Sequence, residues 1–204
     1  MHLATHWQRV YRDRDVTRVS WFQPRPALSL ELLQRVTGPS EAVVDVGAGA
    51  STLADHLLAA GYSDLTLVDL SAEALGHVAA RMGRPEAIRF EVADVRTWRP
   101  GRTFDAWHDR AVFHFLTEEA DREAYRQTLL QTLEPGGHAV VLTFHPTGPD
   151  RCSDLPTARY DADGLFEALG GDTTFELLDA RVEEHVKPDG RIQPFQGVLL
   201  RRKI

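Results

Sequence analysis

One stretch near the start of the chain restricts the possible folds more than any other. Residues 43–46 are apolar and β-branched except for Asp45, as in a buried parallel strand. Gly47 and Gly49 follow at once, and apolar residues with helical spacing resume at Leu53. A strand, a glycine turn and a helix in this order let the backbone approach a nucleotide-like ligand closely. The stretch predicts an α/β sheet with a ligand bound beyond the carboxyl ends of its strands.

Acidic residues mark three successive predicted strands. Asp45 lies on the first, and Asp69 and Asp94 end the next two apolar runs. A carboxylate accepts two hydrogen bonds at once, which suits the paired hydroxyls of a ribose. A dinucleotide-binding turn would place a third glycine where Thr52 stands. The pattern therefore favours a ribose-containing ligand other than a nicotinamide dinucleotide.

These acids and glycines resemble the motifs of class I S-adenosylmethionine-dependent methyltransferases. The resemblance implies that the glycine turn passes under the methionine part of S-adenosylmethionine, whose product after transfer is S-adenosylhomocysteine. It also implies that Asp45 helps to hold the loop and the amino group, that Asp69 binds the ribose, and that Asp94 meets the exocyclic amine of adenine. The cofactor-binding residues expected from it are Trp7, Tyr11, Trp21, Asp45, Gly47, Ala48, Gly49, Asp69, Leu70, Asp94, Val95 and Asp109.

Aromatic residues are concentrated before the first strand. Trp7 and Tyr11 fall at helical spacing, and Trp21 and Phe22 precede a proline-stiffened turn that leads into a helix over residues 27–36. Any one of the four is best explained as cover for the sheet edge, but together they favour a lid over the cofactor. The grouping resembles that of the thiopurine and thiol methyltransferases.

Two further resemblances indicate subgroups of methyltransferases to which this sequence is similar. Residues 61–71 resemble lysine methyltransferase-like sequences of bacteria and eukaryotes, and the whole pattern is similar to bacterial type 12 methyltransferase-domain proteins. The chain lacks the Asn/Asp-Pro-Pro-Tyr signature of enzymes that methylate amino groups of DNA bases or glutamine. This makes those substrates less favoured.

Length and resemblance together predict one Rossmann-like domain over residues 1–204. A chain of 204 residues can bury one α/β core but not two sizeable ones. We expect a helical lid over residues 1–36 and a core over residues 37–204. That core should contain seven strands in a mostly parallel sheet, the seventh antiparallel, with helices on both faces.

The charge balance and cysteine content bear on partners and location. Lys and Arg number 23 against 30 Asp and Glu, and no basic block exists, which argues against nucleic acid or an anionic membrane as the main partner. Cys152 is the single cysteine, and no apolar run approaches about 18 residues. We therefore expect a cytoplasmic enzyme, a monomer or homodimer, that acts on a small molecule.

The second informative stretch follows the predicted fourth strand, residues 104–109. Asp109 should face the transferred methyl group and orient the acceptor, or else cap the turn. His114 is the candidate general base, with core packing between two phenylalanines as the alternative. His108 is more consistent with a structural role, and no metal site is expected. Cys152 has no identifiable base, so a packing thiol is favoured over a nucleophile.

The expected function is methyl transfer to a sulfur, oxygen or nitrogen atom of a small molecule. Such a transfer is an in-line displacement that depends mainly on alignment of the reacting atoms. Residues 145–160 have no periodicity and follow a predicted strand, so we expect a lid or binding loop there. Two alternatives remain open: methylation of lysine in a protein, and a cofactor-binding scaffold without catalysis.

Overall fold

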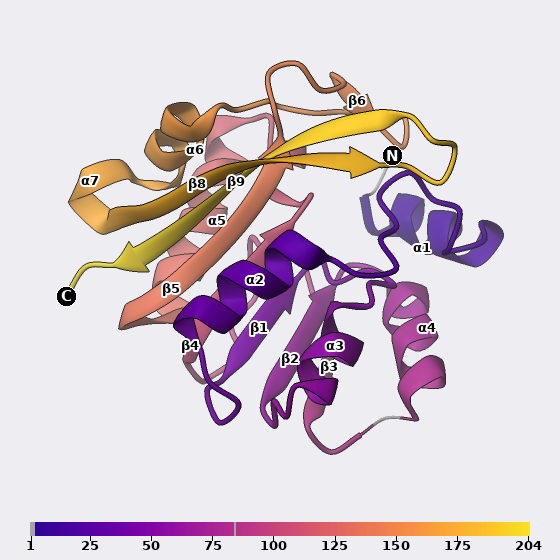
Figure 1. The fold of residues 1–204 in the computed structure, drawn as a ribbon, viewed down its shortest axis with the longest axis horizontal. Helices are drawn as coiled ribbons and strands as arrows, with labels where there is room; N and C mark the ends of the chain where they lie inside the picture. Colours follow the sequence, from indigo (N-terminus) through magenta and orange to yellow (C-terminus); the bar gives the residue numbers. More distant parts are fainter. Residues whose placement is uncertain (1–2, 84) are drawn as a thin grey trace.

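Seven strands form one sheet in the computed structural model, which describes residues 3–83 and 85–204. They are β1 (Val43–Val46), β2 (Leu65–Asp69), β3 (Ile88–Val92), β4 (Phe104–Arg110), β5 (Leu133–Phe144), β8 (Phe175–Val186) and β9 (Ile192–Arg202). Their order across the sheet is β3-β2-β1-β4-β5-β9-β8. Strands β1 to β5 pair in parallel, whereas β9 runs antiparallel to both of its neighbours. The expected Rossmann-like sheet with an antiparallel seventh strand is confirmed (Figure 1).

Helices cover both faces of the sheet (Figure 1). They are α1 (Leu3–Asp13), α2 (Ala27–Val36), α3 (Leu53–Ala59), α4 (Ala72–Met82), α5 (Glu119–Thr132), α6 (Ala162–Leu169), the short α7 (Gly171–Thr174) and the 3-10 helix η1 (Phe113–Phe115). Helices α2, α3 and α4 contribute to one core cluster, and α5 and α6 contribute to the other. No helix of residues 3–83 and 85–204 is long and apolar enough to cross a membrane.

Strand β1 is covered on both faces of the sheet, which explains why its sequence is mostly apolar. Val43 packs into the core cluster below α2 and α3, while Val44 and Val46 pack into the cluster below α5. Alternate residues of a strand point to opposite faces, so a strand covered on both faces needs apolar residues throughout. Asp45 is the exception, and it is 5% exposed. A buried carboxylate in this position requires hydrogen-bond partners, and the neighbouring strand supplies one.

Two expectations about local structure need correction. The sequence predicts a fifth strand over residues 138–144, but this strand begins at Leu133. Residues 145–160 contain a small hairpin, made by β6 (Arg151–Cys152) and β7 (Leu155–Pro156). Helix α2 packs into the main core through Leu30 and Leu33, whereas Trp7, Tyr11 and Trp21, which precede it, line the first cleft.

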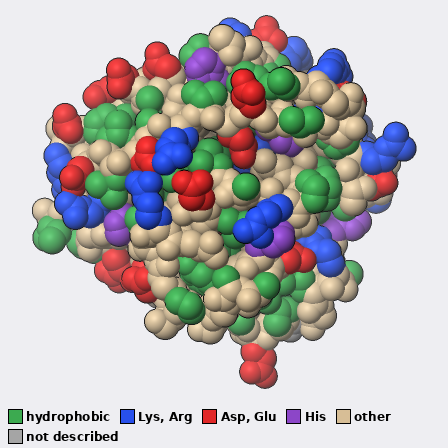
Figure 2. All heavy atoms as spheres, viewed as in Figure 1, with side chains coloured by type: hydrophobic (Ala, Val, Ile, Leu, Met, Phe, Trp, Pro, Cys, Tyr) green, Lys and Arg blue, Asp and Glu red, His purple; other side chains and the backbone are tan. Residues whose placement is uncertain are grey.

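Acidic and basic side chains are interspersed on the face of the molecule shown in Figure 2. Ion pairs on the surface link distant elements, such as Arg35 of α2 with Asp179 of β8 at 2.6 Å. Exposed pairs of this kind contribute little to stability, on the order of 0–1 kcal/mol. The folded state therefore depends mainly on the two apolar clusters.

Candidate functional site

The glycine turn after β1 forms the floor of the site. Gly47 and Gly49 have φ angles of 63° and 57°, both in the left-handed region. A Cβ atom at Gly47 would overlap the Val112 side chain, and one at Gly49 would overlap the Tyr11 hydroxyl. Side chains are therefore excluded at both positions by backbone conformation and by space. The bare turn leaves main-chain atoms available to a ligand.

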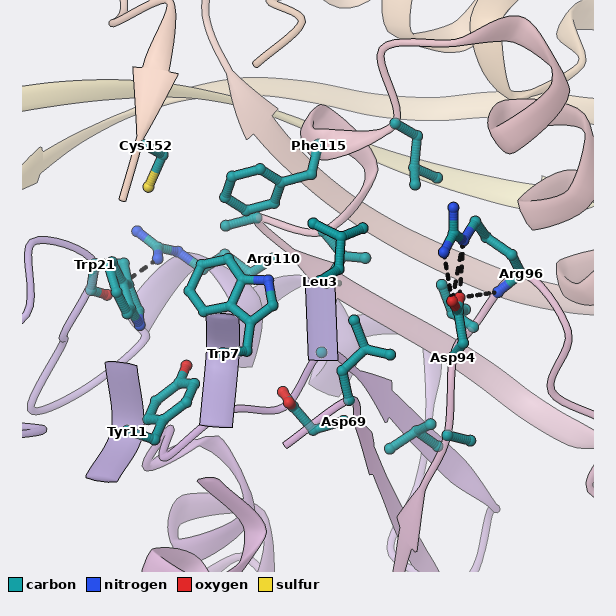
Figure 3. Close-up of a pocket in the computed structure, with 18 of the residues that line it drawn as sticks. Leu3, Trp7, Tyr11, Trp21, Asp69, Asp94, Arg96, Arg110, Phe115 and Cys152 are labelled. Atoms are coloured by element: carbon teal, nitrogen blue, oxygen red, sulfur yellow. Dashed lines mark hydrogen bonds and ion pairs between the residues drawn. The ribbon is translucent and has the colours of Figure 1, made fainter. Parts of the chain in front are cut away.

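Asp69, the last residue of β2, fastens this turn. Its Oδ2 accepts a hydrogen bond from the backbone N–H of Gly49 at 2.8 Å, and its Oδ1 accepts one from the backbone N–H of Ser71 at 2.8 Å. Burial raises the pKa of Asp69 to about 6. Each oxygen has further acceptor capacity, so the carboxylate can still receive two hydroxyl groups. Figure 3 shows this side chain at the cleft.

Asp45 is held from the adjacent strand. Its Oδ1 accepts a hydrogen bond from Nδ1 of His108 at 2.7 Å, and Nε2 of His108 lies 2.8 Å from the Ser29 hydroxyl. His108 therefore belongs to a polar chain of three residues, which extends the structural role expected from the sequence. Asp45 and His108 both line a cleft above the glycine turn.

Asp94 lies two residues beyond the end of β3 and is already engaged. Arg96 donates to its carboxylate from Nε at 2.9 Å and from Nη2 at 2.5 Å. The same guanidinium donates to Asp121, in the first turn of α5, at 2.7 Å. Asp94 and Arg96 line the cleft together, so a ligand amine reaching Asp94 would meet a carboxylate with a fixed orientation.

Two adjoining clefts lie over the carboxyl ends of β1, β2 and β4. The first contains about 900 Å³ of space and the second about 540 Å³, and both figures include space that is open to solvent. They share four wall residues, which are Tyr11, Trp21, Gly47 and Arg110. The first cleft contains the predicted residues Trp7, Tyr11, Trp21, Gly47, Asp69, Leu70, Asp94 and Val95. The second contains Tyr11, Trp21, Asp45, Gly47, Ala48 and Gly49.

An aromatic cluster covers the clefts from the side of α1. Trp7 lies with its ring centroid 5.8 Å from that of Trp21 and 5.3 Å from that of Phe115, both edge to face. Gln8 fixes the helix to the start of α4: its Oε1 accepts a hydrogen bond from the Ser71 hydroxyl at 2.5 Å. Trp7, Tyr11 and Trp21 thus come together as expected for a lid, and Figure 3 shows them around the cleft.

Arg110, at the end of β4, is a cleft residue to which the sequence reasoning gave no role. It donates to Glu183 from Nη2 at 3.0 Å and to the carbonyl oxygen of Trp21 from Nη1 at 3.2 Å. Its guanidinium lies 4.1 Å from the centroid of the Phe195 ring. A positive charge at the end of a strand that faces the ligand is the sequence signal that could have indicated it.

Cys152, on β6, also lines the first cleft. Burial raises the pKa of its thiol to about 12, so the sulfur stays protonated at neutral pH. A protonated thiol is a poor nucleophile, in agreement with the packing role favoured by the sequence.

Asp109 does not reach either cleft. Its side chain is 0% exposed, and its Oδ1 accepts a hydrogen bond from the backbone N–H of Val112 at 2.9 Å. Its Oδ2 accepts from the backbone N–H of Phe113 at 3.1 Å and from the Tyr125 hydroxyl at 2.7 Å. These bonds cap the turn after β4, which is the alternative left open above. The geometry contradicts contact between Asp109 and a cofactor or acceptor.

His114 is also enclosed by the core. It is 0% exposed, with its ring centroid 4.3 Å from that of Phe144 and 4.4 Å from that of Phe115. Its Nδ1 accepts a hydrogen bond from the backbone N–H of Phe144 at 3.3 Å, and burial lowers its pKa to about 3. A neutral imidazole without solvent access cannot take a proton from an acceptor, so the expected general base is contradicted by the packing.

Comparison with known proteins shows which family and which solved structures this chain resembles. The profile of a family described as "Methyltransferase domain" matches residues 43–137. Nodulation protein S of Rhizobium tropici is 29% identical over 119 residues, which cover 58% of this chain and 50% of that protein. The eEF1A lysine and N-terminal methyltransferase of Danio rerio is 26% identical over 146 residues, 69% of this chain and 21% of that protein. The matched parts thus span half or less of these relatives.

Solved structures show the same fold along nearly the whole chain. The 1,6-didemethyltoxoflavin-N1-methyltransferase of Burkholderia thailandensis has a TM-score of 0.78 at 22% identity, covering 99% of this chain and 88% of that one. The N-methyltransferase NodS of Bradyrhizobium japonicum has a TM-score of 0.75 at 16% identity, covering 99% of both chains. Both structures contain S-adenosylhomocysteine.

The fold is that of class I S-adenosylmethionine-dependent methyltransferase structures, and residues 43–137 match a methyltransferase-domain family. Three features of the clefts fit S-adenosylmethionine: a turn with two glycines that lack side chains, the Asp69 carboxylate with spare acceptor capacity, and the Asp45 carboxylate above the turn. The narrower likenesses to thiopurine and thiol methyltransferases and to type 12 proteins stay predictions.

Proposed function

We propose that this chain transfers a methyl group from S-adenosylmethionine to a small-molecule acceptor. The observation that carries the proposal is the apolar and aromatic lining of the first cleft beside the glycine turn, with α1 and the β6–β7 hairpin contributing walls. The name of one structural neighbour supports it, because that protein is a 1,6-didemethyltoxoflavin-N1-methyltransferase with bound 1,6-didemethyltoxoflavin.

The cofactor would lie across both clefts. Asp69 would accept the ribose hydroxyls, and Asp94, oriented by Arg96, would accept from the adenine amine in the first cleft. Asp45 and the glycine turn would hold the methionine part in the second cleft. Because Tyr11 and Trp21 stand between the clefts, they would flank the middle of the cofactor.

The acceptor would lie among the aromatic residues, close to Arg110. S-adenosylmethionine supplies an electrophilic methyl group on a positively charged sulfur. The acceptor's lone pair forms the new bond to the methyl carbon while the carbon–sulfur bond breaks and its electron pair stays on sulfur. Arg110 is a buried cation balanced by Glu183, so it can donate a hydrogen bond to an electron-rich acceptor without adding net charge.

The walls of the first cleft offer little help with proton removal. Among the described wall residues, Cys152 is a protonated thiol and Asp94 is ion-paired with Arg96. Asp69, the other carboxylate of this cleft, would be occupied by the ribose hydroxyls. We therefore expect acceptors that react through a lone pair already available near neutral pH. Thiols, acidic phenols and heteroaromatic nitrogens satisfy this condition, whereas alkyl ammonium groups must first lose a proton.

Methylation of protein lysine is the second candidate, because two curated relatives are eEF1A lysine and N-terminal methyltransferases. One experiment separates the candidates. The protein is incubated with methyl-labelled S-adenosylmethionine and either a panel of thiols, phenols and heteroaromatic amines or a protein extract. We expect label in small molecules. Label confined to protein would favour the lysine candidate, and cofactor binding without any transfer would favour a scaffold.

A further inference from the structure

The polar chain that begins at Asp45 crosses from the second cleft to helix α2. Asp45 and His108 are paired neighbours on β1 and β4, and Ser29 lies in the first turn of α2. The three residues, Asp45, His108 and Ser29, are 5%, 3% and 1% exposed. Polar groups buried to this extent lower stability unless every donor and acceptor is satisfied.

With Asp45 ionised and His108 neutral, the hydrogen bonds are compatible with one arrangement of protons. An ionised Asp45 can only accept, so Nδ1 of His108 carries the proton shared over 2.7 Å. Nε2 of a neutral imidazole then accepts from the Ser29 hydroxyl over 2.8 Å. Both nitrogens of His108 and the Ser29 proton are satisfied, and the negative charge remains on Asp45. The less common Nδ1–H tautomer of His108 is thus imposed by its two partners.

The hydrogen bond from His108 occupies only one of the two carboxylate oxygens of Asp45. Within residues 3–83 and 85–204, no hydrogen bond to Oδ2 of Asp45 is found, and the residue lines the second cleft. The charged groups lining that cleft are Asp45 and Arg110, and Arg110 is ion-paired with Glu183. The cleft therefore presents a carboxylate that lacks a cationic partner.

The order of groups is that of a serine–histidine–aspartate triad, but the serine cannot act as a nucleophile. Ser29 is 1% exposed and is absent from the walls of both clefts among the described residues. Nothing that enters either cleft can reach its hydroxyl. Of the three hydrogen-bonded residues, Asp45 is the one that would face the ligand. The other two therefore have a supporting role.

We propose that Ser29 and His108 are positioning residues that hold the Asp45 carboxylate, ionised and aimed into the second cleft, for the amino group of the cofactor's methionine part. This inference rests on the proposed function. His108 fixes the rotation of the carboxylate by occupying Oδ1, and Ser29 fixes the tautomer of His108. Residues that orient a ligand in this way typically change affinity without touching the bound molecule.

The test compares two ligands that differ only in the amino-acid part. S-adenosylhomocysteine carries the amino group, whereas methylthioadenosine retains the adenosine and the sulfur but lacks it. His108→Phe should weaken binding of S-adenosylhomocysteine about tenfold, and Ser29→Ala about threefold, as expected for lost hydrogen bonds near a charge. Methylthioadenosine should bind all variants within about twofold of wild type. Calorimetry measures both ligands on the full chain.

A control separates positioning from general loosening of the core. Tyr62→Phe removes a buried hydrogen bond to Thr37, at the other end of α2, and should leave the affinity for both ligands unchanged. Equal losses for the two ligands in the His108 and Ser29 variants, or no loss for either, would overturn the inference. If the wild-type chain binds neither ligand, the proposed function itself fails.

The tautomer gives a readout independent of binding. Nitrogen-15 spectra of the imidazoles should show His108 as the Nδ1–H form, assigned by the loss of its signals in His108→Phe. Ser29→Ala should shift this population towards the Nε2–H form. A wild-type His108 in the Nε2–H form would overturn the assignment, because that form leaves an ionised Asp45 without its donor.

Discussion

At the scale of single residues, Asp69 titrates close to neutral pH. Burial raises its pKa to about 6, so both oxygens accept hydrogen bonds above that pH, and one carries a proton below it. We therefore expect the affinity for S-adenosylhomocysteine to fall as the pH drops through about 6. Calorimetric titrations at a series of pH values measure this dependence.

The variant Asp69→Asn tests whether the Asp69 carboxylate causes this pH dependence of affinity. Asp69→Asn should weaken binding at neutral pH by about 1.5–3 kcal/mol and should remove the decline at acid pH. Asp64→Asn is the matched control, since Asp64 is ion-paired with Arg102 at 2.6 Å and is not a wall residue of either described cleft. If Asp69→Asn keeps the pH dependence of wild type, a different group is responsible.

Asp109 should matter for stability rather than for binding. Three donors point at its carboxylate, and an amide in its place would turn an N–H group towards one of them. Asp109→Asn should lower the free energy of unfolding by about 1–3 kcal/mol, with little change in cofactor affinity. Tyr125→Phe removes one donor and should cost less. Urea unfolding measures the losses, and a large affinity loss would contradict this role.

The pKa of the Asp109 carboxyl group also predicts how the stability loss in Asp109→Asn varies with pH. Burial raises the pKa of Asp109 to about 6, above its value of about 3.9 in an unfolded chain. The folded state therefore binds the proton more tightly, and this contribution to stability is present below about pH 4 and is lost as the pH rises through about 6. The stability difference between wild type and Asp109→Asn should therefore shrink over that range. A constant difference would contradict the raised pKa.

The alternation of side chains along β4 explains why Asp109 was predicted to be a site residue and Arg110 was not. Trp107 and Asp109 point to the same face of β4, towards α5, whereas His108 and Arg110 point to the opposite face. The sequence shows this alternation, but it does not say which face the ligand occupies. The ends of the strands could be predicted, and with them Asp69 and Asp94, because position along a strand follows from the apolar run.

At the scale of elements, the contact of α1 with α4 should control access to the clefts. Gln8 accepts hydrogen bonds from the Ser71 hydroxyl at 2.5 Å and from the backbone N–H of Glu73 at 3.0 Å. Gln8→Ala should speed hydrogen exchange of the α1 amides and weaken cofactor binding several-fold, about 1 kcal/mol. Arg12→Ala, on the exposed side of the same helix, should change neither. Unchanged exchange in Gln8→Ala would show that other contacts hold α1.

The start of β5 shows a limit of local sequence rules. Pro135, Gly136 and Gly137 are residue types that usually interrupt strands, which led to an expected start at residue 138. The strand nevertheless begins at Leu133, opposite Phe104, and a register shift separates that pair from the next one, Ala106 with His138. An irregular pairing of this kind absorbs the poor strand formers. Only the partner strand reveals it.

At the scale of the whole molecule, cofactor binding should stabilise the fold by mass action. A ligand that binds only the folded state at about 100 times its dissociation constant adds about 2.7 kcal/mol. S-adenosylhomocysteine should therefore raise the melting temperature in a concentration-dependent way, and a nicotinamide dinucleotide should not. Differential scanning fluorimetry compares the two. Stabilisation by the dinucleotide alone would contradict the site described here.

Most of the architecture followed from the sequence, because buried parallel strands and amphipathic helices leave strong periodic patterns. The bounds of β1 and α2 agree with expectation. The hairpin of β6 and β7 and the short helix α7 left no such pattern, since a few residues cannot show a period. The division into a lid over residues 1–36 and a core stays a prediction.

The position of β9 between β5 and β8 has a consequence for synthesis on the ribosome. Strands β1 to β5 can pair among themselves as soon as they emerge, but β8 appears before β9, its only strand neighbour in the described sheet. Until β9 emerges, the growing polypeptide exposes one edge of β5 and an unpaired β8, the kind of surface that chaperones bind and that promotes aggregation. Slow translation between residues 175 and 192 would prolong that exposed state.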